Sequence, residues 1–529
     1  MTHPSDSVRF RWDSAGGLAV LLGIIAVGAS LRWQQIHESL WLDELHTAWC
    51  ALGDWDDVRP RSWVGNQSPL YFWLIKLGTT AIGPSEATLR APSLAAGLLL
   101  IVVTADLVRR TTGSNTAGLW TALLVALDRH LVFFAQEARA YAIVQCLAWS
   151  HAAVTWQLTQ TPTLRWRLAF IVGGVLLVYL HYTAALFLVG ECVFLLGWTV
   201  WSSQRSAADP AAPGKLAGYS PWQLSADCLL MAAACLPAVP HVEYVAAHRG
   251  GWRGVVSPPS WSSFLGIFRW TVYAWVPIIA VWLHLASANR AARHASSRRI
   301  TLSPPQRPGG YTAWCWLVVA VVCVPTLLAW TASTMDTASL FFRRYLAPAA
   351  VGPILATPLA AWTFRNSWLR HGSCLVVVIL SVATSNMLAT WRTEGRLLPD
   401  RRQDWRGAVA FINSQPSNGG QRVTWVRSGF LEADRLRGPH DRLLVAFCLA
   451  PVRSLYELTG KAIPLPNAPL EDRVSWTGEP TAETLDRWWI INGRPDTHNT
   501  WEAAVRRSLN ATSPPRTITH RALFGGVLV

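Results

Sequence analysis

Long apolar runs fill most of the first 390 residues of this chain. A helix needs about 20 apolar residues to cross the hydrocarbon of a bilayer, and 11 runs are near that length: 15–31, 88–108, 115–133, 139–158, 168–182, 183–201, 222–240, 262–286, 311–331, 345–364 and 372–390. Hydrophobic residues make up 51% of the sequence and charged residues 15%, which is typical of membrane proteins. The sequence therefore predicts a mainly α fold, a polytopic membrane helical bundle with about 11 transmembrane helices over residues 1–390.

Basic residues recur in every second loop between these runs. Four loops hold Arg109 and Arg110, Arg165 and Arg167, Arg205 and Lys215, and Arg365 and Arg370, and a fifth holds the arginines at 290, 293, 298, 299 and 307. Such loops face the cytoplasm, so the N-terminus is predicted to be cytoplasmic in a multi-pass protein of the plasma or inner membrane. We interpret residues 15–31 as a retained helix and not a signal peptide, because ten more apolar runs follow.

The first outer loop, residues 32–87, is long and acidic, with seven acidic residues against four basic ones. Its apolar stretch Pro69–Gly83 is short and carries Lys76. A crossing there would invert every later loop, so we predict a re-entrant or interfacial helix instead.

The polar C-terminal part, residues 391–529, is predicted to be an extracytoplasmic α/β domain. Asp404 can cap a helix that begins at Trp405, and Arg422–Val426, Leu443–Cys448 and Trp488–Ile491 have the pattern of strands. The chain has no glycine loop of the kind that holds nucleotides.

The stretch Trp41–Cys50 places two carboxylates, Asp43 and Glu44, just after the first apolar run. Read as a helix, it has leucines and Trp49 on one face and Asp43, His46 and Thr47 on another, as in a helix that lies on a membrane surface. The alternative is a solvated loop in which Asp43 is a helix N-cap.

Polar residues also gather at three outer ends of the predicted helices, at Gln136–Tyr141, His181–Tyr182 and Phe342–Tyr345. Arginine binds phosphate through a rigid fork of donors, so such a cluster can hold a lipid-linked phosphate, although an arginine at this height can instead snorkel to lipid headgroups. Glu191 lies in the middle of a predicted span. There it either marks a path through the membrane or is buried with a hydrogen-bonding partner such as a Ser, a Thr or a Trp N–H.

Two other classes of function find no support in the residue pattern. The net charge of +15 comes mostly from scattered arginines, without a basic stripe with stacking aromatics, so no nucleic-acid partner is expected. The nine cysteines show no metal-ligand pairing, and most lie inside apolar runs as packing residues.

Seven short motifs, in order, resemble those of the GT-C membrane glycosyltransferases, in particular the branch with dolichyl-phosphate-mannose protein mannosyltransferases and lipid A aminoarabinose transferases. They are Asp43-Glu44, Pro69–Leu74, Leu89–Ser93, Gln136–Tyr141, His181–Thr183, Arg344–Pro348 and Asp404–Ala408. No single one of these short motifs is specific for the family. Seven of them in family order, over roughly residues 15–410, are specific.

The resemblance implies an inverting transferase that passes a sugar from a polyprenyl phosphate donor to a lipid, glycan or protein acceptor outside the cytoplasm. It implies Asp43, with Glu44, as the catalytic pair and Asp43 as general base. The substrate-binding residues are then Glu137, Arg139, Tyr141, His181, Arg343, Arg344, Tyr345 and Lys76.

The chain departs from the family before Pro69, where the lipid A branch has a Glu-Lys pair that serves metal and phosphate. Asn66-Gln67-Ser68 stands here, and neutral amides are poor replacements for those charges. No cofactor is expected with certainty, a divalent metal is doubtful, and Lys76 can partly replace the lost cation. A transporter or flippase for a lipid-linked substrate and a non-catalytic membrane scaffold stay open as alternatives, and the sugar, the acceptor and the oligomeric state are not readable from the residues.

Overall fold

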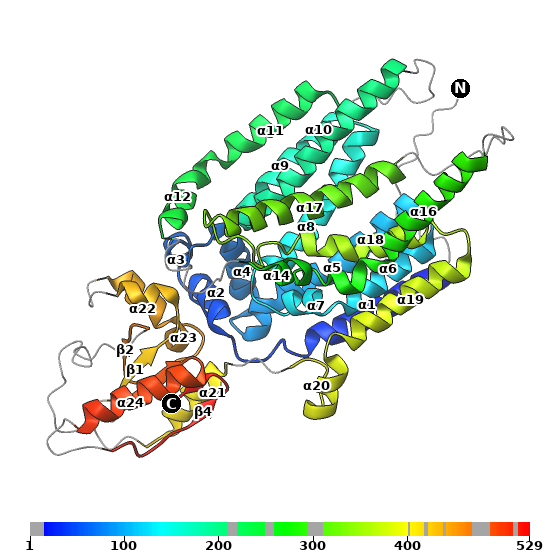
Figure 1. Ribbon diagram of the computed structural model, residues 1–529. Coiled ribbons are helices and arrows are strands. Elements are labelled where there is room, and N and C mark those ends of the chain that lie inside the picture. The colour runs from blue at the N-terminus through cyan, green and yellow to red at the C-terminus, as the bar shows by residue number, and fades with distance from the viewer. Residues whose placement is uncertain are drawn as a thin grey trace.

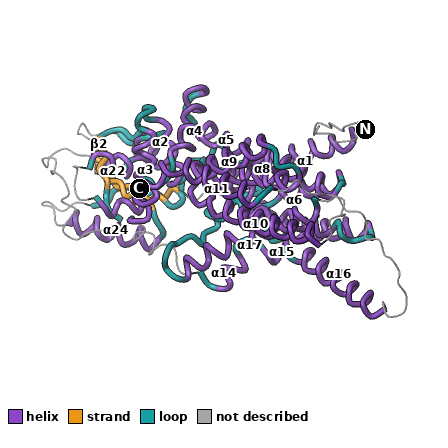
Figure 2. The backbone as a smooth tube through the Cα atoms, turned by 90° about the horizontal axis from the view of Figure 1, so that it is seen from above, coloured by secondary structure: helices purple, strands orange, loops and turns teal. Residues whose placement is uncertain are grey.

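The computed structural model describes residues 15–208, 219–248, 259–294, 310–399, 403–416, 422–436, 441–467, 487–510 and 517–529. A bundle of helices makes up most of the molecule, and a small domain with a sheet lies at one end of it, beside α2 and α3 (Figure 1). The perpendicular view places all the strands at that same end (Figure 2).

The bundle is formed by helices from residue 15 to residue 394. They are α1 (Ala15–Trp33), α5 (Glu86–Thr112), α6 (Asn115–Leu127), α7 (Arg129–Ala135), α8 (Tyr141–Gln160), α9 (Leu164–Leu180), η1 (Tyr182–Ala184), α10 (Ala185–Ala208), α11 (Pro221–Cys235), η2 (Leu236–Ala238), α12 (Val239–Ala247), α14 (Trp261–Gly266), α15 (Trp270–Tyr273), α16 (Trp275–His294), α17 (Tyr311–Thr334), η3 (Ala349–Val351), α18 (Gly352–Ala361), α19 (Ser367–Ala383) and α20 (Met387–Glu394). Three shorter helices lie between α1 and α5: α2 (Leu42–Leu52), α3 (Val58–Val64) and α4 (Pro69–Ile82).

The helices make this a multi-pass membrane protein. Among the described residues, five helical segments are long and apolar enough to cross a membrane, namely α1, α5, Tyr182–Ser202, Pro221–Ala247 and α17. The bent pairs α6 with α7 and α19 with α20 raise the number to seven if each pair is one span. The count of 11 crossings and the orientation stay predictions. The expected span 262–286 is divided into α14, α15 and α16, with Arg269 in the left-handed region at φ 53° between the first two.

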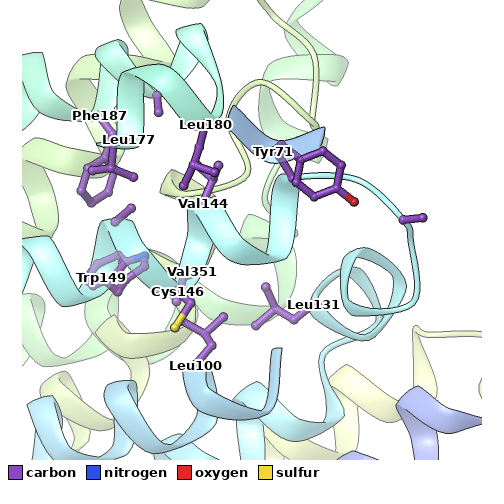
Figure 3. Packing of buried hydrophobic residues seen from close by; sticks show 14 of the residues in the cluster. Tyr71, Leu100, Leu131, Val144, Cys146, Trp149, Leu177, Leu180, Phe187 and Val351 are labelled. Carbon is purple, nitrogen blue, oxygen red and sulfur yellow. The ribbon is translucent and has the colours of Figure 1, made fainter. Parts of the chain in front are cut away.

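Close helix packing and buried polar pairs hold the bundle together. Gly190 of α10 lies so near α17 that a Cβ at this position would meet the Ala320 carbonyl oxygen at 3.0 Å. Figure 3 shows part of the apolar core, in which Trp149 of α8 lies near Phe187 of α10, with ring centroids 5.9 Å apart.

Glu191 of α10 is fully buried and partnered. Its Oε1 accepts from the Thr155 hydroxyl at 3.1 Å, which agrees with the second of the two alternatives, a buried carboxylate with a hydrogen-bonding partner. Its Oε2 lies 2.6 Å from Nδ1 of His151, a partner that the sequence analysis did not foresee. The other nitrogen of His151 lies 2.8 Å from the Phe170 carbonyl. His151 therefore bridges the Glu191 carboxyl group of α10 and the Phe170 carbonyl of α9.

A 65° bend between α6 and α7 gives the candidate site one of its walls. Asp128 produces the bend, because its Oδ1 accepts from the backbone N–H groups of His130 and Leu131 and so starts α7 in a new direction. Its Oδ2 accepts from Arg269 at 3.1 Å and from the Tyr273 hydroxyl at 2.7 Å. Arg32 of α1 donates to two carbonyls at the end of α6, where a helix has unpaired acceptors.

The C-terminal domain, the part of the chain from residue 403 on, combines helices with a five-stranded sheet, and its place outside the cytoplasm stays a prediction. It holds α21 (Trp405–Ser414), β1 (Val423–Arg427), η4 (Leu431–Arg435), α22 (Arg442–Cys448), α23 (Ala450–Arg453), β2 (Lys461–Pro464), β3 (Arg487–Asn492), α24 (Pro495–Asn510), β4 (Leu523–Phe524) and β5 (Val527–Leu528). The strand order is β2-β1-β3-β5-β4. Strand β1 is parallel to β2 and β3, with Trp425 opposite Ile463 and Trp489, whereas β5 is antiparallel to β3 and β4.

Two of the three expected strands and the expected helix cap are present in this domain. Strands β1 and β3 match Arg422–Val426 and Trp488–Ile491, and Asp404 Oδ1 accepts from the Gly407 N–H at 2.9 Å at the start of α21. The strand expected at Leu443–Cys448 is wrong, because this segment is helix α22. Asp441 caps it by accepting from the Leu444 N–H at 3.0 Å, and Leu444, Phe447 and Cys448 then share a buried face with helical spacing.

Candidate active site

Helix α2 carries the acidic pair and packs against α3, α4 and α23. Its N-cap is Trp41, whose N–H donates to Glu44 Oε2 at 3.3 Å, so the alternative that made Asp43 the N-cap is wrong. His46 and Thr47, expected on an outward polar face, are buried. Thr47 donates to the Ala138 carbonyl at 2.8 Å, and burial lowers the pKa of His46 to about 3. Helix α2 is therefore part of the packed interior and not a surface helix.

Asp43 is the accessible carboxylate of the pair. Its Oδ2 lies 2.7 Å from Nη1 of Arg344, and the two side chains are 25% and 24% exposed. Arg139 donates from Nη1 to the Asp43 carbonyl at 3.1 Å. Two of the expected phosphate-binding arginines thus meet the expected base, although they are distant in the sequence.

Glu44 differs from Asp43, because it is fully buried and both its oxygens are used. Arg90 of α5 donates to it from Nε at 2.8 Å and from Nη2 at 2.6 Å, and the Ala138 N–H donates to Oε1 at 2.8 Å. Arg90 also donates to the carbonyls of residues 35, 36, 38 and 39. The pair therefore fixes the chain that leads into α2 and the corner at residue 138, and leaves Asp43 alone to face the open side.

A cavity of about 750 Å³ opens beside Arg344. Charged and polar side chains line one part of it, and apolar rings line another. The lining residues are Gln35, Trp41, Arg129, His130, Phe133, Phe134, Gln136, Glu137, Tyr141, Phe342, Arg343, Arg344, Ser385, Asn386, Thr390, Leu398, Pro399 and Gln403. A volume of this size with mixed lining suits a small polar head with an apolar attachment.

The charge of the cavity is strongly positive. Within the described residues, neither Arg129 nor Arg343 makes a hydrogen bond or an ion pair with another side chain. Burial and the nearby charge of Arg129 lower the pKa of Arg343. Like charges held together in this way favour the binding of an anion, which would remove their repulsion.

The structure brings most of the other sequence-predicted residues to this place. Glu137 and Tyr141 line the cavity. The His181 ring lies next to the Tyr141 ring, with centroids 5.5 Å apart. The Tyr345 ring lies next to His181, with centroids 5.8 Å apart. Lys76 does not reach it, because its ammonium donates to the Gly53 carbonyl and lies over the Trp55 ring.

The C-terminal domain holds the chain on either side of Asp43. Gln403 Oε1 accepts from the Leu42 N–H at 3.0 Å, and the Tyr456 hydroxyl accepts from the Leu40 N–H at 2.8 Å. Tyr456 donates in turn to Glu86 at 3.1 Å, and Arg406 reaches the same oxygen at 3.1 Å. Phe447 packs on Trp49, with ring centroids 5.4 Å apart.

Sequence reasoning missed Arg90, Arg129, His130 and Gln403 as members of this site. Arg90 stood inside the Leu89–Ser93 motif, where only its own charge could have marked it as the partner of a buried acid. Arg129 and His130 read as an interruption of an apolar run, and their place in the cavity depends on the bend at Asp128. Gln403 carries no signal of its own.

Across the described ranges, no group of three or more His, Cys, Asp or Glu side chains is arranged to hold a metal ion. Asn66, which stands where the lipid A branch has a charged residue, donates to Glu432 Oε1 at 2.9 Å.

The comparison with protein families gives one match. Residues 66–214, from before α4 into the segment after α10, match the family described as dolichyl-phosphate-mannose-protein mannosyltransferase. The matched stretch takes in four of the seven motifs, from Pro69–Leu74 to His181–Thr183, and it supports the resemblance to the GT-C membrane glycosyltransferases that these motifs carry.

Solved GT-C structures are similar over most of the chain at low identity. ArnT from Cupriavidus metallidurans in the apo state is 15% identical, with a TM-score of 0.44, and the alignment covers 84% of this chain and 76% of that chain. The same protein bound to undecaprenyl phosphate gives 16% identity, a TM-score of 0.40 and the same coverage. The oligosaccharyltransferase of Archaeoglobus fulgidus is 13% identical, with a TM-score of 0.39, and the alignment covers 85% of this chain and 62% of that chain. No curated protein sequence matches the chain.

Proposed function

We propose that this protein transfers a sugar from a polyprenyl phosphate donor to an acceptor hydroxyl on the extracytoplasmic side of the membrane, with inversion at the anomeric carbon. The observation that carries the proposal is the contact of Asp43 with Arg344, 2.7 Å apart, at the edge of a cavity with further arginines. It puts a candidate base next to candidate phosphate ligands. The family match over residues 66–214 supports a transfer from a lipid-linked sugar.

In the proposed reaction Asp43 is the general base. The acceptor oxygen attacks the anomeric carbon from the face opposite the phosphate, and the bond from that carbon to the phosphate oxygen breaks. The acceptor proton passes to the Asp43 carboxylate, and the electron pair of the broken bond stays on the phosphate. One displacement of this kind inverts the configuration.

The arginines stabilise the departing lipid phosphate. Arg343 and Arg129 have no partner of their own among the described side chains, and Arg344 can move from Asp43 to the phosphate, since both side chains are partly exposed. Charge-assisted bonds from guanidinium groups grow stronger as negative charge develops on the leaving oxygen. Arg139 donates to the Asp43 carbonyl and is the fourth arginine of this set.

The remaining expected residues have supporting parts in this proposal. Glu44 positions Asp43 through Arg90 and does not itself take a proton, because all its acceptor sites are engaged. Glu137 and Tyr141 line the space for the sugar, and His181 and Tyr345 brace Tyr141 from behind. Lys76 braces the loop after α2.

A transporter or flippase for a lipid-linked substrate is the alternative from another class. Such a protein needs polar groups that exchange partners near the middle of the membrane. Glu191 is the candidate, but it is fully buried and both its oxygens are bonded to His151 and Thr155. The transferase is therefore the better supported function.

The test uses purified protein in liposomes with undecaprenyl phosphates that carry mannose, glucose or aminoarabinose. Asp43→Asn keeps the size of the side chain but cannot take the proton, so release of undecaprenyl phosphate should fall by about 10²–10⁴-fold while donor binding survives. Asp56→Asn is the matched control, because Asp56 lies in the same loop and is exposed. A rate for Asp43→Asn close to that of the control would remove Asp43 from the mechanism.

A further inference from the structure

The arginine cavity, the space of about 750 Å³ beside Arg344, takes two of its walls from helices that bend at a break (Figure 1). The first wall is α7, which turns by 65° from α6, and the second is the break between α19 and α20, with a bend of 40°. The residues that follow these two breaks and line the cavity are Arg129, His130, Phe133 and Phe134 on the first wall and Ser385, Asn386 and Thr390 on the second. The position of one break relative to the other therefore sets the spacing of the two walls.

The side chain of Arg269 joins the two breaks. Its Nη1 donates at 3.1 Å to Oδ2 of Asp128, which is the N-cap of α7. Its Nη2 donates at 2.9 Å to the Ser381 carbonyl in the last turn of α19, and also to the hydroxyl of Thr384, the C-cap of that helix. One guanidinium is thus bonded to the start of the first wall and to the end of the helix that leads into the second.

The charges of this pair match the helix ends that they hold. A helix carries partial positive charge at its N-terminus and partial negative charge at its C-terminus, so a carboxylate favours the first and a guanidinium the second. Asp128 accepts from N–H groups at the start of α7, and Arg269 donates at the end of α19. Their side chains are only 4% and 9% exposed. Because removal of one partner would leave the other charge buried and unpaired, replacing Arg269 should separate the two breaks.

A second residue of the same segment makes the same connection. The Tyr273 hydroxyl donates to Asp128 Oδ2 at 2.7 Å and lies 3.1 Å from the Ser381 hydroxyl. Arg269 itself is the N-cap of α15, and its φ of 53° is in the left-handed region. A non-glycine residue keeps this conformation only where its surroundings determine it, and such residues gather at functional sites. The bonds of Arg269 to both breaks account for the conformation.

We propose that Arg269 is a positioning residue for the lipid-linked donor: it fixes the spacing of the two walls and so presents Arg129 of α7 to the lipid phosphate. Arg269 does not line the arginine cavity, so it acts through Asp128 and the end of α19 and does not touch the phosphate. The inference rests on the phosphate binding proposed above for this cavity. It makes the affinity for the donor depend on a residue outside the donor site.

Binding of undecaprenyl phosphate, measured by titration calorimetry of the full chain in detergent micelles, tests the inference without turnover. Arg269→Gln removes the charge and the fork, so the Kd should rise about tenfold or more, because binding groups tolerate little displacement. Arg269→Lys keeps a charge beside Asp128 but cannot reach both helix ends, so its Kd should lie between those of Arg269→Gln and the wild type.

A double variant, Ser381→Ala with Thr384→Val, keeps the ion pair and removes only hydroxyl partners at the second break. Its Kd should rise about threefold, as expected for the loss of a hydrogen bond. Near-UV circular dichroism checks the fold of every variant. This double variant leaves no lone buried charge, so it carries the test even where Arg269→Gln fails to fold.

Arg167→Gln is the matched control. Arg167 of α9 donates to Asp227 of α11 at 2.8 and 2.7 Å, and the Tyr219 hydroxyl donates to the same carboxylate at 2.7 Å. The arrangement repeats that of the arginine, carboxylate and tyrosine at the two breaks, but none of these three residues lines the arginine cavity. The variant should therefore lose stability and keep the wild-type Kd.

Sugar transfer gives a second measurement. In Arg269→Lys the KM for the donor should rise while kcat stays within about threefold of the wild type, because the base and the acceptor are untouched. The inference is overturned if the wild type does not bind undecaprenyl phosphate, if the Arg269 variants and the double variant bind it like the wild type, or if Arg167→Gln weakens binding equally. A wild-type protein that binds undecaprenyl phosphate but releases it from no donor would refute the transferase function alone, since the Kd values would still test Arg269.

Discussion

Replacing Glu44 by Gln should destabilise the protein strongly, although it changes only one atom. The side chains of Glu44 and Arg90 are both 0% exposed and are joined by two hydrogen bonds, and two backbone N–H groups also donate to the Glu44 oxygens. The amide of Gln places an N–H₂ group against a donor whichever way it turns, and the guanidinium stays buried without its countercharge. One-sided removal of a buried pair costs about 3–5 kcal/mol in free energy of unfolding, and we expect Glu44→Gln to lose that much.

The assay is a denaturant titration of protein in mixed micelles, followed by near-UV circular dichroism, with sugar transfer measured on the same samples. The exposed variant Glu457→Gln should stay within about 0.5 kcal/mol of the wild type. The double variant Glu44→Gln, Arg90→Met removes both charges, so it should be more stable than Glu44→Gln alone. A loss below about 1 kcal/mol for Glu44→Gln would refute the assignment of this pair as the anchor of α2.

Three further outcomes are expected. The double variant Arg343→Lys, Arg344→Lys keeps the charge but loses the forked geometry, so binding of undecaprenyl phosphate should weaken by about 1–3 kcal/mol in a titration, and unchanged affinity would leave both as lipid-facing residues. The buried His46 stays neutral down to pH about 3 in the folded protein while the unfolded chain takes up its proton near pH 6.5, so stability should fall as pH drops below about 6.5. Denaturant titrations at several pH values measure this fall as a slope of the free energy of unfolding against pH. In His46→Leu the slope should be smaller, because unfolding then takes up one proton fewer. Accessibility labelling should find a tag after Thr112 in the cytoplasm and a tag after Val529 outside, and the reverse result would overturn the arginine-loop argument.

The class of the fold could be predicted from the sequence. Apolar length and a run of ordered motifs are local properties, so the membrane bundle and the likeness to GT-C glycosyltransferases could be read from residues alone. Asp43 contacts Arg344, which the sequence placed on the same side of the membrane, while its role as base stays a proposal. Asp404 is likewise recognisable from the sequence as the N-cap of α21, because an Asp directly before a helical pattern is a common cap. These are features that need no knowledge of distant partners.

What could not be predicted depends on partners far away in the chain. Glu44 and Asp43 are neighbours with the same chemistry, and only the arrival of Arg90 makes one of them structural. Lys76 looked like a phosphate ligand because the sequence shows its charge. The sequence does not show where the side chain points, and in the structure its ammonium donates to the Gly53 carbonyl. Leu443–Cys448 reads as a strand because a short apolar run has no clear period, until Asp441 caps it as a helix.

The clamp of the C-terminal domain on residues 40 and 42 has a consequence for biosynthesis. Tyr456 and Gln403 are 416 and 361 residues further along the chain than the backbone groups that they hold. At about 5–20 residues per second, the ribosome reaches them roughly 20–80 s after it has made α2. During that interval the bundle helices can enter the membrane, but the segment with Asp43 lacks its final support. The newly made protein therefore acquires the contacts of Tyr456 and Gln403 with residues 40 and 42 only when synthesis is nearly finished, and a chain truncated before residue 403 lacks both.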